Sequence, residues 1–175
     1  MERQAHGFKY ENFIIDKYSL IKSKNYTDKW DAYWNDIPCS IKTHKKGTGI
    51  ELADYFRNQE IVQDFYLFIG FWENEKSNIV ENYILKINGK EYHALFNKEC
   101  GEFFKKMLLS VSNNKEDDNK WKTLMNEGKQ LWKNKTPNLI SPRFKRDHKN
   151  QKRIQCAITN KNFYNYFLPK FEVIL

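Results

Sequence analysis

The chain has few of the residues and patterns that define several large classes of protein. Its three cysteines, Cys39, Cys100 and Cys156, are isolated, so they form neither a zinc-binding pattern nor an obvious disulfide framework. No apolar run of the sequence reaches the length that spans a membrane. The N-terminal stretch lacks the apolar core of a signal peptide. We therefore expect a cytoplasmic protein with no membrane partner.

Signatures of several catalytic classes are also missing. The glycine-bearing turn at residues 45–49 is too short for a phosphate-cradling P-loop, which needs the pattern GxxxxGK[ST]. The histidines are scattered, so His148 has no histidine partner of the kind that a ββα-metal nuclease uses. No Gly-x-Ser-x-Gly or Cys–His arrangement indicates covalent catalysis.

Positive charge and aromatic side chains, in contrast, are abundant. Hydrophobic residues make up 40% of the 175 residues, which is enough for residues 1–175 to form one domain with its own core. The net charge is +8, and this favours an anionic partner, most commonly nucleic acid. Most of the charge is lysine in an asparagine-rich chain, as AT-rich coding sequence also produces, so charge alone leaves both interpretations open.

The stretch 28–43 predicts a β-hairpin with its turn at Asn35-Asp36, because Asn and Asp tolerate the left-handed backbone of a two-residue turn. Counting back from this turn pairs residue 32 with 39 and places Asp31 opposite Ser40. Lys42 then lies on the diagonal, about 7–8 Å away. The simpler alternative is a surface hairpin whose polar face is solvated.

A carboxylate, a hydroxyl and an amine that converge in this way suit the hydrolysis of a phosphodiester bond. The carboxylate would hold Mg²⁺, a hard ion that prefers oxygen ligands. The metal would polarise the phosphate, and the lysine would orient or deprotonate the attacking water.

Hydrophobic periodicity predicts the elements around the hairpin. The predicted helices are 6–23, 50–57, 98–112, 117–133 and 160–167, and the predicted strands are 65–72, 79–87, 92–96, 154–159 and 171–175. Thr48 is a possible N-cap, and Asn88-Gly89 has the sequence of a hairpin turn. We expect Trp121 and Trp132 in the core rather than on a base-stacking surface. These elements predict an α/β fold of the α+β type, with a mixed central β-sheet flanked by helices.

The densest basic segment is 143–153, which we predict to be a loop between residues 142 and 154. It mixes cations with Asn and Gln, whose amides pair with adenine edges, whereas Arg pairs with guanine. The candidate DNA-binding residues are Arg143, Lys145, Arg146, Lys149, Asn150, Gln151, Lys152 and Arg153. They end a helical and basic-loop region, 97–153, that we expect to contact DNA. The alternative is a solvated loop.

The order of a helix with an early Glu, a hairpin carrying Asp…Ser-x-Lys and a buried strand resembles the PD-(D/E)XK nuclease superfamily. That superfamily includes many type II restriction endonucleases and archaeal Holliday-junction resolvases, and the resemblance covers about residues 7–72. It implies a core of helix, β-hairpin, buried strand, helix and strand. It also implies that Asp31 binds Mg²⁺, that Lys42 is the catalytic lysine, and that the peptide carbonyl of Ile41 is a further metal ligand. Glu11 is similar to the helix glutamate that resolvase-like members add to the site.

Two residues depart from the family pattern. Trp30 stands where a proline precedes the aspartate, and Ser40 stands where the family has its second acid. Some restriction enzymes with Ser-x-Lys recruit a carboxylate from the next helix, a little over a dozen residues beyond the lysine.

Three acids are candidates for the missing carboxylate. Glu51 and Asp54 follow Lys42 by nine and twelve residues, and Glu11 lies in the first predicted helix. Each of them could instead be a solvated helix residue. The metal site requires at least one of them beside Asp31.

The resemblance implies a Mg²⁺-dependent endonuclease that hydrolyses double-stranded DNA, most simply a type II restriction enzyme. Cutting both strands of a symmetric site takes two active sites, so we expect a homodimer. A structure-selective enzyme like the junction resolvases, a non-catalytic DNA-binding protein and a protein-interaction domain remain as alternatives.

Overall fold

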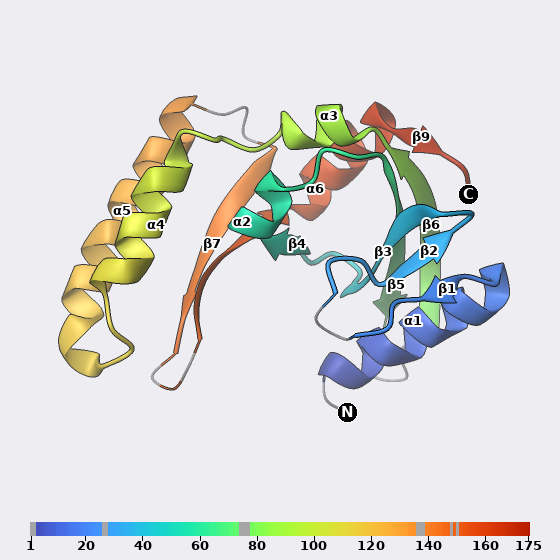
Figure 1. Cartoon of the computed structure of the whole chain (residues 1–175), viewed down its shortest axis with the longest axis horizontal. Coiled ribbons are helices and arrows are strands. Elements are labelled where there is room, and N and C mark those ends of the chain that lie inside the picture. Colours follow the sequence, from blue (N-terminus) through green and yellow to red (C-terminus); the bar gives the residue numbers. More distant parts are fainter. Residues whose placement is uncertain (1–2, 26–27, 74–77, 136–138, 148, 150) are drawn as a thin grey trace. The chain divides into compact units, whose positions relative to one another are not determined.

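Figure 1 shows a computed structural model, which describes residues 3–25, 28–73, 78–135, 139–147, 149 and 151–175. The chain forms two compact units, each assembled from separate segments. Unit 1 comprises Met1–Ile50, Val62–Glu91 and Thr159–Leu175, and unit 2 comprises Glu51–Ile61 and Tyr92–Ile158. Among the described residues, no helix is long and apolar enough to cross a membrane.

Unit 1 is built on a mixed six-stranded sheet with the order β1-β2-β3-β5-β6-β9. Its elements are α1 (Arg3–Tyr18), β1 (Ile21–Lys22), β2 (Ala32–Trp34), β3 (Ile37–Lys45), β5 (Phe65–Glu73), β6 (Asn78–Ile87), α6 (Asn160–Asn162), η2 (Phe163–Phe167), η3 (Leu168–Lys170) and β9 (Glu172–Val173). β3 and β5 run parallel, whereas β2-β3, β5-β6 and β6-β9 run antiparallel. A mixed sheet flanked by helices confirms the predicted fold class.

The hairpin β2–β3 has the predicted register, since Ala32 pairs with Cys39. Asn35 and Asp36 have φ angles of 48° and 63°, so both adopt the left-handed conformation that the turn requires. The turn and the register were therefore both predicted correctly.

β5 is the buried central strand that the sequence predicts, and it lies between β3 and β6. The next element is strand β6, where the core order implied by the resemblance has a helix. α1 covers one face of the sheet, and the ring of Tyr10 lies directly on Gly70: a Cβ on Gly70 would come within 2.6 Å of the ring. Tyr10 is 3% exposed, and its hydroxyl donates to Asn82.

The helix predicted over 6–23 ends early, at Tyr18. Ser19 turns into the left-handed region with a φ of 52°, and the N–H of Leu20 donates to the carbonyl of Ile15 at 2.9 Å. This backbone pattern closes helix C-termini. The residues that follow form the short edge strand β1.

The hairpin predicted at Asn88-Gly89 is wrong, because helix α3 (Gly89–His93) begins there. The side chain of Asn88 accepts the N–H of Glu91 at 3.1 Å, as an N-cap does. The N–H of Gly89 donates to the carboxylate of Asp64 at 2.8 Å. The strand predicted at 92–96 is consequently absent from the described residues.

Unit 2 contains a three-stranded sheet with the order β4-β8-β7 and two longer helices. Its elements are β4 (Ile50–Asp54), α2 (Tyr55–Gln59), α4 (Cys100–Ser110), η1 (Lys115–Asp117), α5 (Asp118–Lys135), β7 (Ile140–Arg146) and β8 (Lys152–Ile158). α4 and α5 pack side by side, with β7 next to them (Figure 1). Trp121 and Trp132 are buried, as predicted.

Three predictions for the region 48–153 were wrong. The first half of the helix predicted over 50–57 is strand β4, in which Ile50 and Leu52 are buried on alternate positions. Asp54, not Thr48, caps the following helix, and its carboxylate accepts the N–H of Phe56 at 2.9 Å.

The loop predicted over 143–153 is instead the hairpin β7–β8. Pro142 made this stretch look irregular in the sequence, but it pairs with Cys156. β7 is an edge strand, where the missing N–H of a proline leaves no ladder hydrogen bond unmade.

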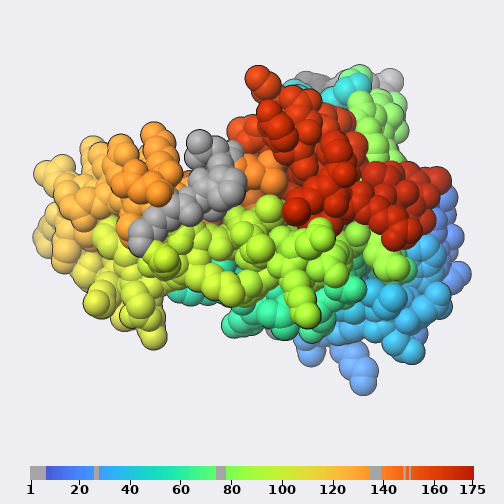
Figure 2. All heavy atoms as spheres, turned by 90° about the horizontal axis from the view of Figure 1, so that it is seen from above, coloured from blue at the N-terminus to red at the C-terminus, as the bar shows by residue number. Residues whose placement is uncertain are grey.

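The C-terminal segment from α6 to β9 lies on the surface of unit 1, where it forms the red area of Figure 2. The carboxylate of Glu81, on strand β6, holds this segment against the sheet. Glu81 accepts the hydroxyl of Tyr164 at 2.6 Å and pairs with Lys46 at 2.7 Å. The hydrogen bond from Lys46 holds the pKa of the Glu81 carboxyl below its usual value.

Gly70→Ala tests the packing of α1. We expect it to lower the free energy of unfolding in urea by about 1–3 kcal/mol, because the buried, hydrogen-bonded ring of Tyr10 has no room to move away from a new methyl group. Gly7→Ala is the control, since a Cβ at Gly7 meets nothing within 4 Å. Equal urea midpoints for Gly70→Ala and the wild type would contradict this packing.

Candidate functional site

Asp31 lies at the start of β2, where the regular ladder of the hairpin stops. Its N–H donates to the carbonyl of Cys39 at 3.0 Å, and Cys39 is already the partner of Ala32. Two successive residues facing one is the arrangement of a β-bulge, which redirects a side chain. The predicted 31–40 pair is therefore not part of the regular ladder, but the Asp31 side chain still reaches Ser40.

Three groups of β3 lie around one oxygen of the Asp31 carboxylate. Its Oδ2 accepts the N–H of Ile41 at 2.7 Å and the hydroxyl of Ser40 at 3.4 Å. The Nζ of Lys42 lies 3.5 Å from the same oxygen. The Asp31 and Lys42 side chains are 28% and 26% exposed, so the ion pair is sheltered but open to a ligand. The predicted convergence of carboxylate, hydroxyl and amine is present.

The peptide group of Ile41 is oriented for the role that the resemblance implies. In a β-strand, the N–H and the C=O of one residue point to the same edge. Because the N–H of Ile41 points at Asp31, its carbonyl oxygen faces the same edge of β3. The thiol of the neighbouring Cys39 is buried, and burial raises its pKa to about 12, so it is not a thiolate nucleophile at neutral pH.

Among the three candidate acids, Glu11 is the one that lines a pocket with Asp31. Both residues line one pocket of about 200 Å³, together with Phe8, Trp30 and residues 22–25. The Glu11 side chain is 21% exposed. Glu11, on α1, therefore remains the candidate for the acid that is missing at Ser40.

Lys22 also lines this pocket, and sequence reasoning missed it. Its Nζ lies 3.2 Å from the Oε1 of Glu11. It was missed because the helix predicted over 6–23 included it, whereas β1 pairs with β2 and sets Lys22 opposite Ala32, next to Asp31. The left-handed residue that ends α1 has no strong sequence signal, because it is a serine rather than a glycine.

Glu51 and Asp54 both interact with other residues of unit 2. The carboxylate of Glu51 lies 2.7 Å from the Nζ of Lys145 and 3.6 Å from a guanidinium nitrogen of Arg143. Asp54 caps α2, and burial raises the pKa of its carboxyl above the usual value.

The donor atoms of the pocket fit a hard divalent cation. Asp31 and Glu11 offer carboxylates and Ile41 a carbonyl, and Mg²⁺ in proteins is held by one or two carboxylates, with water and substrate phosphate completing its shell. Within the described part of the chain, no group of three or more His, Cys, Asp or Glu side chains is placed to hold a metal ion.

The candidate DNA-binding residues divide into two groups. Arg143 and Arg153 are exposed on the β7–β8 hairpin and Lys149 is exposed at its tip, whereas Lys145 and Gln151 are partly buried. Asn150 lies outside the described residues.

Arg146 and Lys152, in contrast, hold the hairpin against the segment between α4 and α5. The Arg146 guanidinium lies 2.6 Å from Asp118 and donates to the carbonyl of Ser112 at 2.8 Å. Its side chain is 4% exposed and lies over the ring of Trp121. The Nζ of Lys152 donates to a carbonyl of the same segment.

Comparisons with protein-family models, with curated proteins and with solved structures found no significant match. What this chain does must be inferred from its own residues.

Arg146→Ala tests whether this arginine is structural. We expect it to lower the free energy of unfolding by about 1–2 kcal/mol, because it removes the hydrogen bonds to Asp118 and Ser112 and the packing of a buried side chain on Trp121. Arg143→Ala, at an exposed ion pair, should change stability by less than about 0.5 kcal/mol. An unchanged melting temperature for Arg146→Ala, with weaker DNA binding, would instead assign Arg146 to the DNA contact.

Proposed function

We propose that the chain is a Mg²⁺-dependent endodeoxyribonuclease that hydrolyses phosphodiester bonds in double-stranded DNA. By resemblance to the PD-(D/E)XK superfamily, we propose a type II restriction endonuclease that acts as a cytoplasmic homodimer. The observation that carries the proposal is the contact of one carboxylate, Asp31, with Ser40, Ile41 and Lys42. Asp31 also lines a pocket with Glu11.

Asp31, Glu11 and the Ile41 carbonyl are the groups that would hold Mg²⁺. When bound, the ion would neutralise charge on the scissile phosphate and lower the pKa of a water molecule. The N–H of Ile41 and the hydroxyl of Ser40 fix the direction of the Asp31 carboxylate, because both donate to its Oδ2. Oδ1 takes no part in these contacts, so it is the oxygen that can face a ligand.

Lys42 has two roles in this arrangement. Without substrate, its ammonium pairs with Asp31 across 3.5 Å. With DNA bound, the same ammonium is within reach of the phosphate or of the attacking water, where it can orient that water and offset negative charge that builds up in the transition state. Lys22 neutralises part of the charge of Glu11 and adds a cation for an adjacent phosphate.

DNA contact is proposed for the exposed cations of the β7–β8 hairpin, Arg143, Lys149 and Arg153. Phosphate contacts of this kind give affinity and orientation. Arg146 and Lys152 support the hairpin and are not included.

A junction-resolving activity is the second candidate, and the position of Glu11 favours it. Resolvase-like members of the superfamily add a helix glutamate to the site, and Glu11 shares a pocket with Asp31. Cleavage of a duplex library and of a four-way junction separates the two: fragments with fixed ends indicate a restriction enzyme, and cutting of the junction alone indicates a resolvase.

Plasmid cleavage in Mg²⁺ tests the catalytic assignment. We expect Asp31→Asn and Lys42→Met each to slow cleavage by at least about 100-fold, because they remove a charge at the reacting phosphate. Asn at position 31 can still accept the N–H of Ile41, so the hairpin should remain folded.

The matched control for that experiment is Asp16→Asn, which removes an exposed carboxylate of α1 outside the pocket. It should cleave at the wild-type rate. Full activity in either Asp31→Asn or Lys42→Met would contradict the nuclease assignment. If the wild type binds DNA in a salt-sensitive way but does not cleave it, the non-catalytic alternative is favoured.

The salt dependence of DNA binding tests the hairpin. Arg143→Gln, Lys149→Gln and Arg153→Gln should each reduce the slope of log K against log salt by about one unit, because each removes one phosphate contact. Lys90→Gln, at an exposed lysine of α3, should leave the slope unchanged. Unchanged slopes for all three hairpin variants would show that the DNA binds elsewhere.

A further inference from the structure

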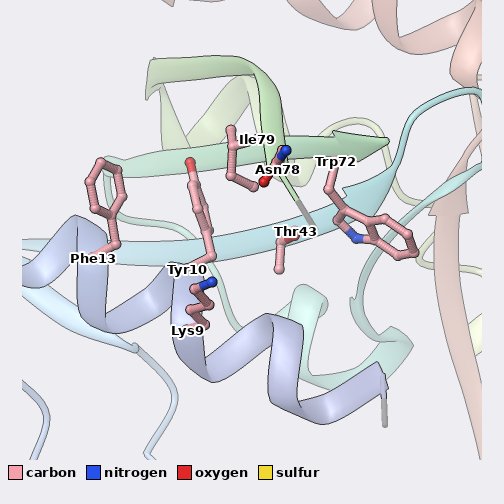
Figure 3. A pocket seen from close by; sticks show the side chains of 7 residues that line it. All are labelled: Lys9, Tyr10, Phe13, Thr43, Trp72, Asn78 and Ile79. Atoms are coloured by element: carbon pink, nitrogen blue, oxygen red, sulfur yellow. The ribbon is translucent and has the colours of Figure 1, made fainter. Parts of the chain in front are cut away.

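A second pocket of unit 1 lies between α1 and the sheet and has no part in the proposed cleavage. It measures about 290 Å³ and is lined by Lys9, Tyr10 and Phe13 from α1 and by Thr43, Trp72 and Ile79 from the strands (Figure 3). Its volume is at the lower end of the range for small-molecule sites, about 300–1,000 Å³.

The walls of this pocket are largely aromatic, and one of them is fixed. The ring of Tyr10 rests on Gly70 and its hydroxyl donates to Asn82, so this wall is in place before any ligand binds. Thr43 pairs with Gly70 across the sheet, and Trp72 follows Gly70 by two residues, so its side chain emerges on the same face of β5. Phe13, at the rim, is 52% exposed.

The base of the pocket holds a hydroxyl that lacks a partner. The Oγ1 of Thr43 is buried and makes no hydrogen bond to any residue that the structure describes. A buried polar atom without a partner is costly, and a hydroxyl can both donate and accept. Rotation about χ1 of Thr43 would turn this hydroxyl toward a ligand with a polar edge. Lys9 adds an ammonium group on the exposed side of the same pocket.

Flat apolar walls, an unsatisfied hydroxyl and a cation together match one ligand chemistry: a planar heteroaromatic ring joined to a phosphate. We propose that this pocket binds the base of a nucleotide, with Trp72 and Phe13 against its faces, Thr43 at its polar edge and Lys9 beside its phosphate. The net charge of +8 favours anionic ligands of this kind. Every base has an apolar face and a polar edge, so the site tolerates different bases.

The nucleotide can come from two sources, a free mononucleotide or an unpaired base of a strand. The full-length protein is therefore titrated in EDTA with AMP, with ribose 5-phosphate, and with a single-stranded oligonucleotide that carries 2-aminopurine. We expect AMP, the oligonucleotide or both to bind, with ribose 5-phosphate at least about tenfold weaker because it lacks the stacking ring. Binding of AMP identifies the free nucleotide as a source, and quenching of 2-aminopurine identifies a base in a strand.

Three substitutions localise the binding. Trp72→Leu should weaken it by about tenfold, and Thr43→Val, which keeps the shape but removes the hydroxyl, by about fivefold. Lys9→Gln should reduce the salt dependence of binding. Thr123→Val is the control, because the Thr123 hydroxyl donates to a carbonyl of its own helix. The variants are compared by circular dichroism, and Thr43→Val decides the question if Trp72→Leu does not fold.

The proposal is overturned if neither AMP nor the oligonucleotide binds, if ribose 5-phosphate binds as tightly as AMP, or if Thr43→Val and Lys9→Gln both bind as the wild type does. It does not rest on the cleavage activity. Repeating the titration with Asp31→Asn separates the two, since loss of cleavage leaves this binding unchanged.

Discussion

The hydrogen bond from the N–H of Ile41 to the carboxylate of Asp31 is the contact on which the candidate site depends. The ladder of the β2–β3 hairpin stops at Ala32, and the N–H of Ile41 would otherwise have no strand partner on that edge. A side chain therefore takes the place of a backbone carbonyl. Because an unpaired backbone N–H is costly, this bond fixes the carboxylate beside the two polar side chains of the same strand.

Two pairs of opposite charges lie close to that hydrogen bond. Asp31 pairs with Lys42 and Glu11 pairs with Lys22, so each carboxylate has its own ammonium group. Ion pairs that are partly exposed contribute little stability, so a ligand can displace them. In the proposed function, these lysines would face phosphate and these carboxylates a divalent cation.

Unit 2 shows a contrast between cations that look alike in the sequence. Arg143 and Arg146 are three residues apart on one strand, yet the first is 45% exposed and the second 4%. Neighbouring positions of a strand face opposite sides, so Arg143 faces solvent and Arg146 faces α5. Arg146 packs over Trp121 and anchors the segment between α4 and α5, which gives the hairpin a rigid base.

Local signals in the sequence were sufficient for several elements. The Asn35-Asp36 turn fixed the register of β2–β3, because a two-residue turn with left-handed residues allows one pairing. The continuous apolar run of β5 and the helical periodicity of α4 and α5 were equally clear. Where two signals competed, the tertiary structure decided. Asn88-Gly89 caps a helix instead of forming a turn, and Pro142 is accommodated on an edge strand.

The sequence by itself determined that Asp31, Ser40 and Lys42 come together, because a short hairpin brings its own residues together whatever surrounds it. Only the tertiary structure decided which candidate acid shares a pocket with Asp31. Glu11 lines it because α1 packs across the sheet, while Glu51 is engaged with Lys145 in unit 2. Such long-range placement depends on packing between elements, which local sequence patterns do not encode. For the same reason, the sequence did not predict the position of Lys22 or the pocket above Gly70.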